Sequence, residues 1–482
     1  MHHPIAKLII GGHERSQGSA GTLNVLDPAT ATPLHELPRA SQTEALEAAE
    51  LAALGQQEWA ALSAYERCTI LRRAAAAMRE DCERGALAIT REQGKPLEQA
   101  RTEWLASADL LDWHAEEGRR LYGREVPSRS SNLRLRVLTR PIGPVAALTA
   151  WNFPAWGAMQ KIGAALAAGC AVVVKPAEIS PTPAWLIARA LLDAGVSPQA
   201  ISVLWGEPSA IAETLIAAPQ IRAVTLTGSA GVGRQIAAAA GKELKKVVME
   251  LGGHGPVVVA RDADLPRLIT EATRWKFRNA GQVCVSPTRF IIEEPLYEAF
   301  VEGFAAAAAQ LRIGPGDDPQ SQMGPLTTER QLHHIEALVA DAAARGARVC
   351  CGGERLPRPG FFHAPTVLAD VPLQARAMNE EPFGPLALVT RAENLKQALA
   401  EANRLPVGLG AYLFANHPAA IAEATTKLQC GMLAINHFAL SLPEMPFGGV
   451  RDSGFGSEGG NEGIRAFTSP QAISEYIPDY PA

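Results

Sequence analysis

The chain has 482 residues, of which 47% are hydrophobic and 20% are charged, a balance that is typical of folded globular proteins and excludes a disordered or fibrous chain. With 45 basic and 50 acidic residues, its formal charge is −5, which gives no basic surface for nucleic acid or for an anionic membrane. At roughly 150 residues per domain, the length predicts about three domains, or two large ones.

The N-terminal part of the chain is predicted to be mainly helical. From Thr43 to about Arg120, apolar residues recur every three or four positions in a sequence rich in Ala, Leu and Glu. The period changes at Asn132 to Arg140, where Leu and Val alternate with Arg and Thr as in a half-exposed strand. Because this strand lies between helical regions, we expect it to form a projecting arm.

Short apolar strands that alternate with helices follow Pro141, and this order predicts parallel βαβ units of Rossmann-like architecture. No internal repeat of fixed period is found, which argues against a solenoid or propeller. The first series of strands is predicted at 145–149, 171–174, 202–204, 224–227 and 247–251. The second series has strands at 289–292, 386–390 and 411–414, and helices at 296–311 and 328–344. A glycine-rich stretch and another strand-like segment, near 472–476, follow this series.

The sequence carries no membrane, secretory or metal-binding signal. Its longest wholly apolar run, 162–174, contains two glycines and is shorter than the roughly 20 residues of a membrane-spanning helix. The apolar residues 8–10 are followed at once by two glycines, so we expect no signal peptide and a cytoplasmic protein. Seven irregularly spaced cysteines predict no disulfide framework, and without Cys-x-x-Cys or His-x-x-x-His spacing we expect no metal.

A glycine-rich turn lies between a predicted strand and the helix that follows it. Gly228, Ser229 and Gly233 would let backbone N–H groups and a helix N-terminus approach a phosphate. The segment lacks the Lys and Ser/Thr of a P-loop, and also the third Gly or Ala of the dinucleotide-binding fingerprint. A plain connecting loop therefore stays an alternative.

A lysine and a glutamate follow the strand at 171–174. Lys175 and Glu178 would lie beyond the carboxyl end of a parallel strand, where ligands bind in open α/β sheets. The Glu178 carboxylate could accept two ribose hydroxyls and would repel a 2′-phosphate, which favours NAD over NADP. A solvated loop is the alternative.

Three further residues could carry chemistry. Cys284 lies in a turn of small residues and could be a nucleophile, although most single cysteines are buried fillers. Asn152 could donate to a developing oxyanion, and Glu250, at a strand end, could act as a general base. Either of these two could equally be a cap or a surface residue. No Gly-x-Ser-x-Gly motif supports serine hydrolase chemistry.

Taken together and in this order, the motifs resemble the aldehyde dehydrogenase superfamily. They are Trp151-Asn152-Phe153-Pro154, Lys175-Pro176-Ala177-Glu178, Thr227-Gly228-Ser229, Glu250-Leu251-Gly252-Gly253, Gly281-Gln282-Val283-Cys284, Glu381-Pro382-Phe383-Gly384-Pro385 and Pro446-Phe447-Gly448-Gly449.

The resemblance implies an α/β fold with three parts. We expect a Rossmann-like NAD-binding domain at 1–120 and 141–250, an α/β catalytic domain at 251–440, and a small β oligomerisation arm at 121–140 and 460–482. The arm would cross to a neighbouring subunit, which gives a homodimer or homotetramer and pairs an otherwise open strand edge.

The resemblance also implies a mechanism. Cys284 would attack the aldehyde carbon, and the oxyanion would be held by the Asn152 side chain and the Cys284 backbone N–H. Glu250, acting through water, would be the base that activates the thiol. Hydride transfer to the nicotinamide would leave a thioester, which water activated by Glu250 would hydrolyse to the acid.

For the cofactor, the resemblance implies contacts with the adenosine ribose, the pyrophosphate and the nicotinamide. Ser229, in the turn with Gly228 and Gly233, would meet the pyrophosphate at the helix N-terminus. We expect NAD, with NADP also possible. The remaining expected cofactor residues are Trp151, Lys175, Glu178, Glu381 and Phe383.

The substrate is expected to be a small carboxylated semialdehyde. Residues 276–279 resemble the succinate-semialdehyde dehydrogenase branch, in which Arg278 would hold the distal carboxylate. Gln160 stands where that branch has a second Arg, and Ser441 could be a further contact. Residues 441–446 and 284–289 look more like the 2-oxoglutarate semialdehyde dehydrogenases.

Other functions stay open beside this one. One alternative is a broad-specificity aldehyde dehydrogenase, and another is a coenzyme-A-acylating enzyme, although acylating relatives generally lack the Glu250 base. A third, from a different class, is a catalytically silent binding homologue, which the intact Asn152, Glu250 and Cys284 argue against. Ser286 replaces a second cysteine that many relatives have, which excludes a regulatory disulfide at that place.

Overall fold

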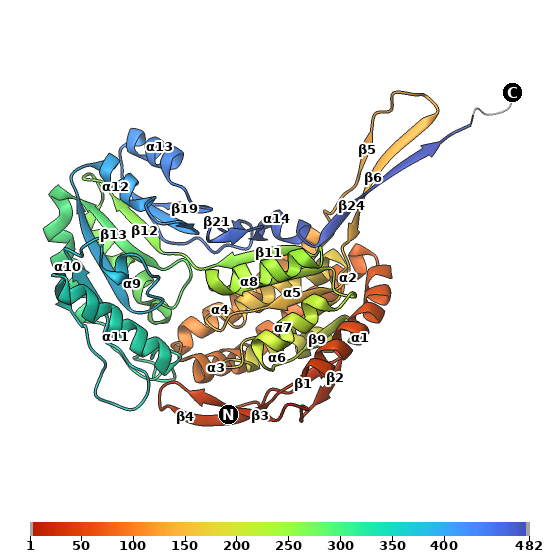
Figure 1. The fold of residues 1–482 in the computed structure, drawn as a ribbon, viewed down its shortest axis with the longest axis horizontal. Helices are drawn as coiled ribbons and strands as arrows, with labels where there is room; N and C mark the ends of the chain where they lie inside the picture. The colour runs from red at the N-terminus through yellow and green to blue at the C-terminus, as the bar shows by residue number, and fades with distance from the viewer. Residues whose placement is uncertain (1–2, 479–482) are drawn as a thin grey trace.

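The computed structural model describes residues 3–478, so the last four residues of the expected arm, 479–482, lie outside the described part of the chain. Two α/β halves lie side by side, and a three-stranded arm projects from the half that carries the N-terminal helices (Figure 1). Within 3–478, no helix has the length and apolar character needed to cross a membrane.

The helical region predicted from Thr43 to Arg120 is confirmed. Ser41 and Ser63 each begin a helix in a capping box with the glutamate three residues later, and Gly94, at φ 89°, ends the third helix. The helices are α1 (Gln42–Ala61), α2 (Ala64–Glu80), α3 (Cys82–Gln93) and α4 (Leu97–Gly118). The sequence did not predict the preceding strands β1 (Leu8–Ile10), β2 (His13–Arg15), β3 (Thr22–Asp27) and β4 (Thr32–Pro38).

The first large sheet has the strand order β2-β1-β9-β8-β7-β10-β11-β22. All five predicted strands of this series are present and mutually parallel. Because the chain runs outward from β7 to β9 on one side and then to β10 and β11 on the other, the β7/β10 boundary is a switch point, where such sheets bind ligands. The strands are β7 (Val145–Leu148), β8 (Val172–Lys175), β9 (Ile201–Val203), β10 (Ala223–Gly228), β11 (Lys246–Leu251) and β22 (Gly454–Phe455). The helices are α5 (Trp156–Ala168), α6 (Thr182–Asp193), α7 (Pro208–Ala217) and α8 (Ala230–Lys242).

The second large sheet has the order β14-β15-β16-β13-β12-β18-β19, and only its β14–β15 pair is antiparallel among the described strands. Its predicted strands and helices are confirmed, whereas β12, β14, β15 and β19 were not predicted. The strands are β12 (Gly255–Val259), β13 (Pro287–Glu293), β14 (Arg348–Cys351), β15 (Thr366–Ala369), β16 (Leu386–Ala392), β18 (Gly410–Phe414) and β19 (Met432–Ile435). The helices are α9 (Leu265–Phe277), α10 (Tyr297–Ala309), α11 (Glu329–Ala344), α12 (Leu395–Ala402) and α13 (Pro418–Lys427).

The arm is a sheet of β5 (Arg124–Val126), β6 (Leu133–Pro141) and β24 (Thr468–Tyr476), with β6 in the middle. In the structure, the strand expected at 132–140 pairs with the C-terminal strand, because β6 and β24 pair along their whole length. The arm's role in oligomerisation and the domain boundaries stay predictions. Short elements complete the fold: β17 (Val407–Gly408), β20 (Pro446–Phe447), β21 (Val450–Arg451), β23 (Glu458–Gly459) and α14 (Gly460–Arg465).

Candidate active site

The carboxyl ends of β7, β10 and β11 meet the loop before β13 at a cavity of about 510 Å³. Most of its wall is apolar, and a few polar groups converge on it, as in small-molecule sites. Five predicted site residues line it: Asn152, Glu250, Arg278, Cys284 and Ser441. Its apolar wall includes Phe153, Trp156, Trp275, Leu442 and Phe447.

The loop that carries Cys284 has an unusual backbone. Asn279 and Ala280 both have φ 52°, and Gly281 has φ 72°, so three successive residues are left-handed. A Cβ at Gly281 would lie 2.0 Å from the carbonyl oxygen of Gly384, which only glycine avoids. Left-handed Ala is strained, and such strain persists where packing fixes the backbone, commonly at functional sites. The loop leaves the Cys284 side chain partly exposed to the cavity.

Glu250 is brought to the same cavity by the end of β11 and by two glycines that follow it. A Cβ at Gly252 would lie 2.5 Å from a carboxylate oxygen of Glu381, and one at Gly253 would lie 2.9 Å from the Cys284 carbonyl oxygen. Side chains at these positions would push the Cys284 loop and Glu381 away from β11. The Gly-Gly pair therefore permits the approach of the predicted base to the predicted nucleophile.

Electrostatics keep both groups protonated at neutral pH. Burial, reinforced by the charge of Glu458, raises the pKa of Glu250 to about 8. Burial and the charge of Glu250 raise the pKa of the Cys284 thiol well above its ordinary value. Oε1 of Glu250 is buried and has no hydrogen-bond partner among residues 3–478, so it can accept a proton or a water hydrogen bond. A thiol in this setting needs a neighbouring base before it can attack.

A buried ion pair behind Glu250 was missed by the sequence analysis. Lys161, on α5, donates to the Glu458 carboxylate and, at 2.6 Å, to the Thr227 hydroxyl. Glu458 and Thr227 both line the cavity. The sequence does contain a sign of this ion pair. Lys161 directly precedes the longest apolar run of the chain, and a lysine at such a place indicates a buried, paired cation.

Asn152 is held by its backbone as well as by its side chain. Its carbonyl accepts from Lys95 Nζ at 3.1 Å and from Asn279 Nδ2 at 2.9 Å. Its side-chain Nδ2 donates to the Gln282 carbonyl at 3.1 Å, which leaves a second N–H for another acceptor. Lys95 also pairs with Glu103, whose carboxylate accepts the backbone N–H of Ala155 at 2.9 Å. These contacts fix the loop that carries the predicted oxyanion donor.

We expect Lys95→Met to lower kcat about tenfold or more and to change KM less, because the Asn152 amide would be displaced from the oxyanion position. Steady-state NADH formation measures both constants. Lys396→Met, which removes an exposed lysine of α12, is the matched control. Since Glu103 would lose its partner, the double variant K95M/E103Q is measured alongside. Unchanged kcat in both folded variants would contradict the positioning role.

The predicted adenosine and pyrophosphate residues lie at the ends of β8 and β10. Lys175 Nζ and a Glu178 carboxylate oxygen are 2.5 Å apart. Ser229 is the exposed N-cap of α8 and accepts from the Val232 N–H at 3.4 Å. A Cβ at Gly233 would lie 2.4 Å from Leu251 Cδ2, so this glycine brings α8 close to β11. The exposed first turn of α8 gives backbone donors suited to a pyrophosphate.

The predicted nicotinamide residues, Glu381 and Phe383, lie next to the Cys284 loop and to Trp151. The rings of Trp151 and Phe383 meet edge-on with centroids 5.5 Å apart. Glu381 accepts the Gly253 N–H at 3.3 Å, and burial raises the pKa of Glu381 to about 8. Lys276, which lowers this pKa, donates to the Ser286 hydroxyl at 3.0 Å.

Of the predicted substrate residues, Arg278 and Ser441 line the cavity and Gln160 does not. The Arg278 guanidinium lies 4.5 Å from the Trp275 ring centroid and 5.5 Å from that of Phe153. Its Nε is buried without a hydrogen-bond partner, and Arg278 is in none of the ion pairs found within residues 3–478. Gln160 is buried behind the cavity near Gly459. The structure thus separates Gln160 from Arg278.

Comparison with known proteins then decides the family, because residues 15–473 match the model of the aldehyde dehydrogenase family. The chain belongs to this family. The resemblance and the α/β fold inferred from the motifs are thereby confirmed, and the chain is an oxidoreductase that acts on aldehydes.

Several relatives of this aldehyde dehydrogenase have named substrates. It is 45% identical over 462 residues, 96% of each chain, to 4-(hydroxymethyl)benzenesulfonate dehydrogenase of Comamonas testosteroni. It is 39% identical over 459 residues, 95% of each chain, to the NADP+ succinate-semialdehyde dehydrogenase of Escherichia coli. Among solved structures, succinate-semialdehyde dehydrogenase of Burkholderia pseudomallei is 38% identical, with a TM-score of 0.96 over 98% of each chain.

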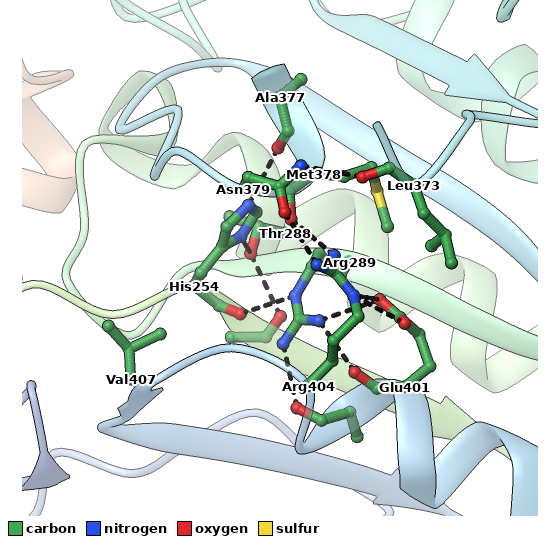
Figure 2. A network of polar contacts seen from close by, with 12 residues as sticks. His254, Thr288, Arg289, Leu373, Ala377, Met378, Asn379, Glu401, Arg404 and Val407 are labelled. Atoms are coloured by element: carbon green, nitrogen blue, oxygen red, sulfur yellow. Dashed lines mark hydrogen bonds and ion pairs between the residues drawn. The ribbon is translucent and has the colours of Figure 1, made fainter. Parts of the chain in front are cut away.

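A buried polar network joins the segment before β12 to the start of β13 in this aldehyde dehydrogenase (Figure 2). Arg289, at the start of β13, donates to the His254 carbonyl at 3.1 Å and to the Glu401 carbonyl at 3.1 Å. His254 in turn contacts the Thr288 hydroxyl at 2.6 Å and the Ala377 carbonyl at 2.9 Å. His254 follows the glycines after Glu250, and Thr288 follows the Cys284 loop, so the network ties the two segments that carry the predicted base and the predicted nucleophile together.

Proposed function

We propose that this aldehyde dehydrogenase oxidises an aldehyde with a distal anionic group to the carboxylic acid, with NAD(P) as the hydride acceptor. The proposal rests on the Arg278 guanidinium, which has no carboxylate partner among residues 3–478 and lines the same cavity as Cys284 and Glu250. An incoming anion would supply the missing partner in bidentate geometry. Most of the cavity wall is apolar, so this pairing would be weakly screened by water.

In the proposed mechanism, Cys284 Sγ bonds to the aldehyde carbon as its proton passes to Glu250, directly or through water. The second N–H of the Asn152 amide and the Cys284 backbone N–H donate to the oxyanion. A bound NAD(P) would supply the hydride acceptor for the carbon held by Cys284. After Glu250 has passed this first proton to solvent, it takes a proton from the water that attacks the thioester. The acid is then released, and the Cys284 thiolate that leaves regains a proton from Glu250.

The residues at the sheet ends fit an NAD(P) cofactor. The exposed N-terminus of α8 at Ser229 would hold the pyrophosphate, and Lys175 and Glu178 would meet the adenosine ribose. Glu381 and Phe383 would hold the nicotinamide half. The Glu178 carboxylate favours NAD, because it would repel a 2′-phosphate unless Lys175 turns toward that group.

Two substrate classes fit this site. A small ω-carboxylated semialdehyde, such as succinate semialdehyde or 2-oxoglutarate semialdehyde, is favoured by Arg278 and by the named succinate-semialdehyde relatives. An aromatic aldehyde with a ring carboxylate or sulfonate is the second candidate. The aromatic wall of Trp156, Trp275 and Phe153 and the Comamonas relative favour it. Coenzyme-A acylation is disfavoured, because Glu250 is present as a base for water.

Arg278→Ala is expected to raise KM for succinate semialdehyde about 30-fold or more, because the buried carboxylate loses its charged partner. KM for butanal, which has a similar length and no charge, should change little. NADH absorbance with each aldehyde, including 4-formylbenzenesulfonate, and with each cofactor measures the effect. Arg267→Ala, at an exposed position of α9, is the matched control. Equal effects on charged and uncharged aldehydes would remove the anion hypothesis.

A further inference from the structure

A second cluster of titratable side chains lies outside the catalytic cavity. His3 precedes β1, His35 lies on β4 and Glu92 lies near the end of α3. The Nε2 atoms of the two histidines are 3.0 and 2.9 Å from the same carboxylate oxygen, Oε1 of Glu92. The Glu92 side chain is fully buried, and those of His35 and His3 are 3% and 13% exposed. The mechanism above uses none of these groups.

The contact between His35 and Glu92 needs a proton or a cation. Nε2 of His35 lies only 2.9 Å from a carboxylate oxygen of Glu92. A proton or a metal cation must lie between these two atoms, because two lone pairs at this distance repel. A metal ion bound at Nε2 would leave the proton of the neutral imidazole on Nδ1, which lies 3.3 Å from the Glu36 carbonyl, a group that can only accept.

We propose that His3, His35 and Glu92 bind one divalent transition-metal ion of the zinc type. Two imidazole nitrogens and one carboxylate oxygen are a recurrent ligand set for zinc, with water in the fourth position. In a tetrahedral zinc site, neighbouring ligand atoms are about 3.3 Å apart. The three ligand atoms lie within 4.8 Å of one another, and the two N–O separations need to open by only a few tenths of an ångström.

The surroundings supply the outer hydrogen bonds that metal ligands require. Thr182, at the start of α6, donates its backbone N–H to Oε2 of Glu92 at 3.0 Å and its hydroxyl to Oε1. The Glu36 carbonyl orients the His35 ring through Nδ1. Such partners fix the direction and the tautomer of the ligands before the metal arrives. The ion would link three parts of the fold, namely the segment that precedes β1, strand β4 and helix α3. Its role would therefore be structural.

The test is cobalt and zinc binding to the full-length chain in a Cys284→Ala background, which removes the cavity thiol as a competing ligand. After treatment with EDTA and dialysis, we expect one equivalent of Co2+ per chain with the visible absorption of a four-coordinate nitrogen and oxygen site. Zinc should displace the cobalt and raise the melting temperature.

His3→Ala is the decisive variant, because it removes a ligand near the chain terminus without unpairing the Thr182–Glu92 contacts. Metal affinity should fall about tenfold or more in His3→Ala and in His35→Gln, and should be unchanged in the matched control His13→Ala, an exposed histidine of β2. No stoichiometric uptake, or equal uptake by His3→Ala, would overturn the proposal and leave a protonated hydrogen-bonded cluster. Neither result depends on the catalytic proposal.

Discussion

Cys284→Ala is expected to abolish aldehyde-dependent NADH formation, with a loss on the order of 10⁴-fold or more, because no covalent intermediate can form. Cofactor binding should stay nearly intact, since the expected cofactor residues lie outside the Cys284 loop, at the ends of β7 and β8, in the turn between β10 and α8 and the first turn of α8, and at 381–383. The side chain faces the cavity, so the substitution should not disturb the core. Steady-state absorbance measures turnover, and quenching of protein fluorescence by the cofactor measures binding.

Cys350→Ala, on a partly exposed strand of the second sheet, is the matched control for this loss and should retain full activity. Appreciable turnover in Cys284→Ala would exclude Cys284 as the nucleophile. Loss of both turnover and cofactor binding would indicate a structural defect instead, which circular dichroism would show.

Glu250→Gln is expected to slow thioester hydrolysis about 10²- to 10⁴-fold, because a buried amide cannot take a proton from water. If the first half-reaction still proceeds, a burst of NADH will precede slow turnover. Rapid mixing of enzyme, cofactor and aldehyde measures the burst and the steady rate. Glu243→Gln, at an exposed position after α8, is the matched control. Unchanged steady-state hydrolysis would count against Glu250 as the base.

The pH dependence of turnover should identify the same group. Because the pKa of Glu250 is raised to about 8 by burial and by the charge of Glu458, its carboxyl is mostly protonated at pH 7 and becomes a base only as the pH rises through 8. Hydrolysis should therefore increase from pH 7 to 9 in the wild type, and this increase should be lost in Glu250→Gln. An identical profile in both proteins would assign the ionisation to another group.

The long, periodic elements of the fold could be predicted from the sequence, and the short or interrupted ones could not. The helices between Thr43 and Arg120 show a clear helical period and are confirmed. β12 was missed because it begins with Gly255-Pro256, and proline normally argues against a central strand. β1, with three residues, is too short to show a period. Its strand character arises from pairing with β2 and β9.

The site was predictable where chemistry is concentrated in a local motif. Asn152, Glu250 and Cys284 lie in motifs whose residues are adjacent in sequence, and the structure gathers all three at one cavity. Lys95 and Glu103 lie in no such motif, and only packing brings them to Asn152. The cluster of His3, His35 and Glu92 is harder to predict from the sequence, because His35 and Glu92 are separated by 57 positions and no spacing rule links them.

The short strand β22 lies where the chain passes between the two sheets. The chain leaves the first sheet after β11 and returns as β22, which pairs antiparallel with β11 so that Gly454 lies opposite Glu250. Both chain crossings between the two sheets therefore pass through this one strand pair, which joins the half that carries Cys284 to the half that carries Glu250. A Cβ at Gly454 would lie 1.9 Å from the Met249 carbonyl oxygen, so β22 can pack this closely against β11 only with glycine at position 454. We therefore expect the packing of this strand pair to influence the separation of Cys284 from Glu250.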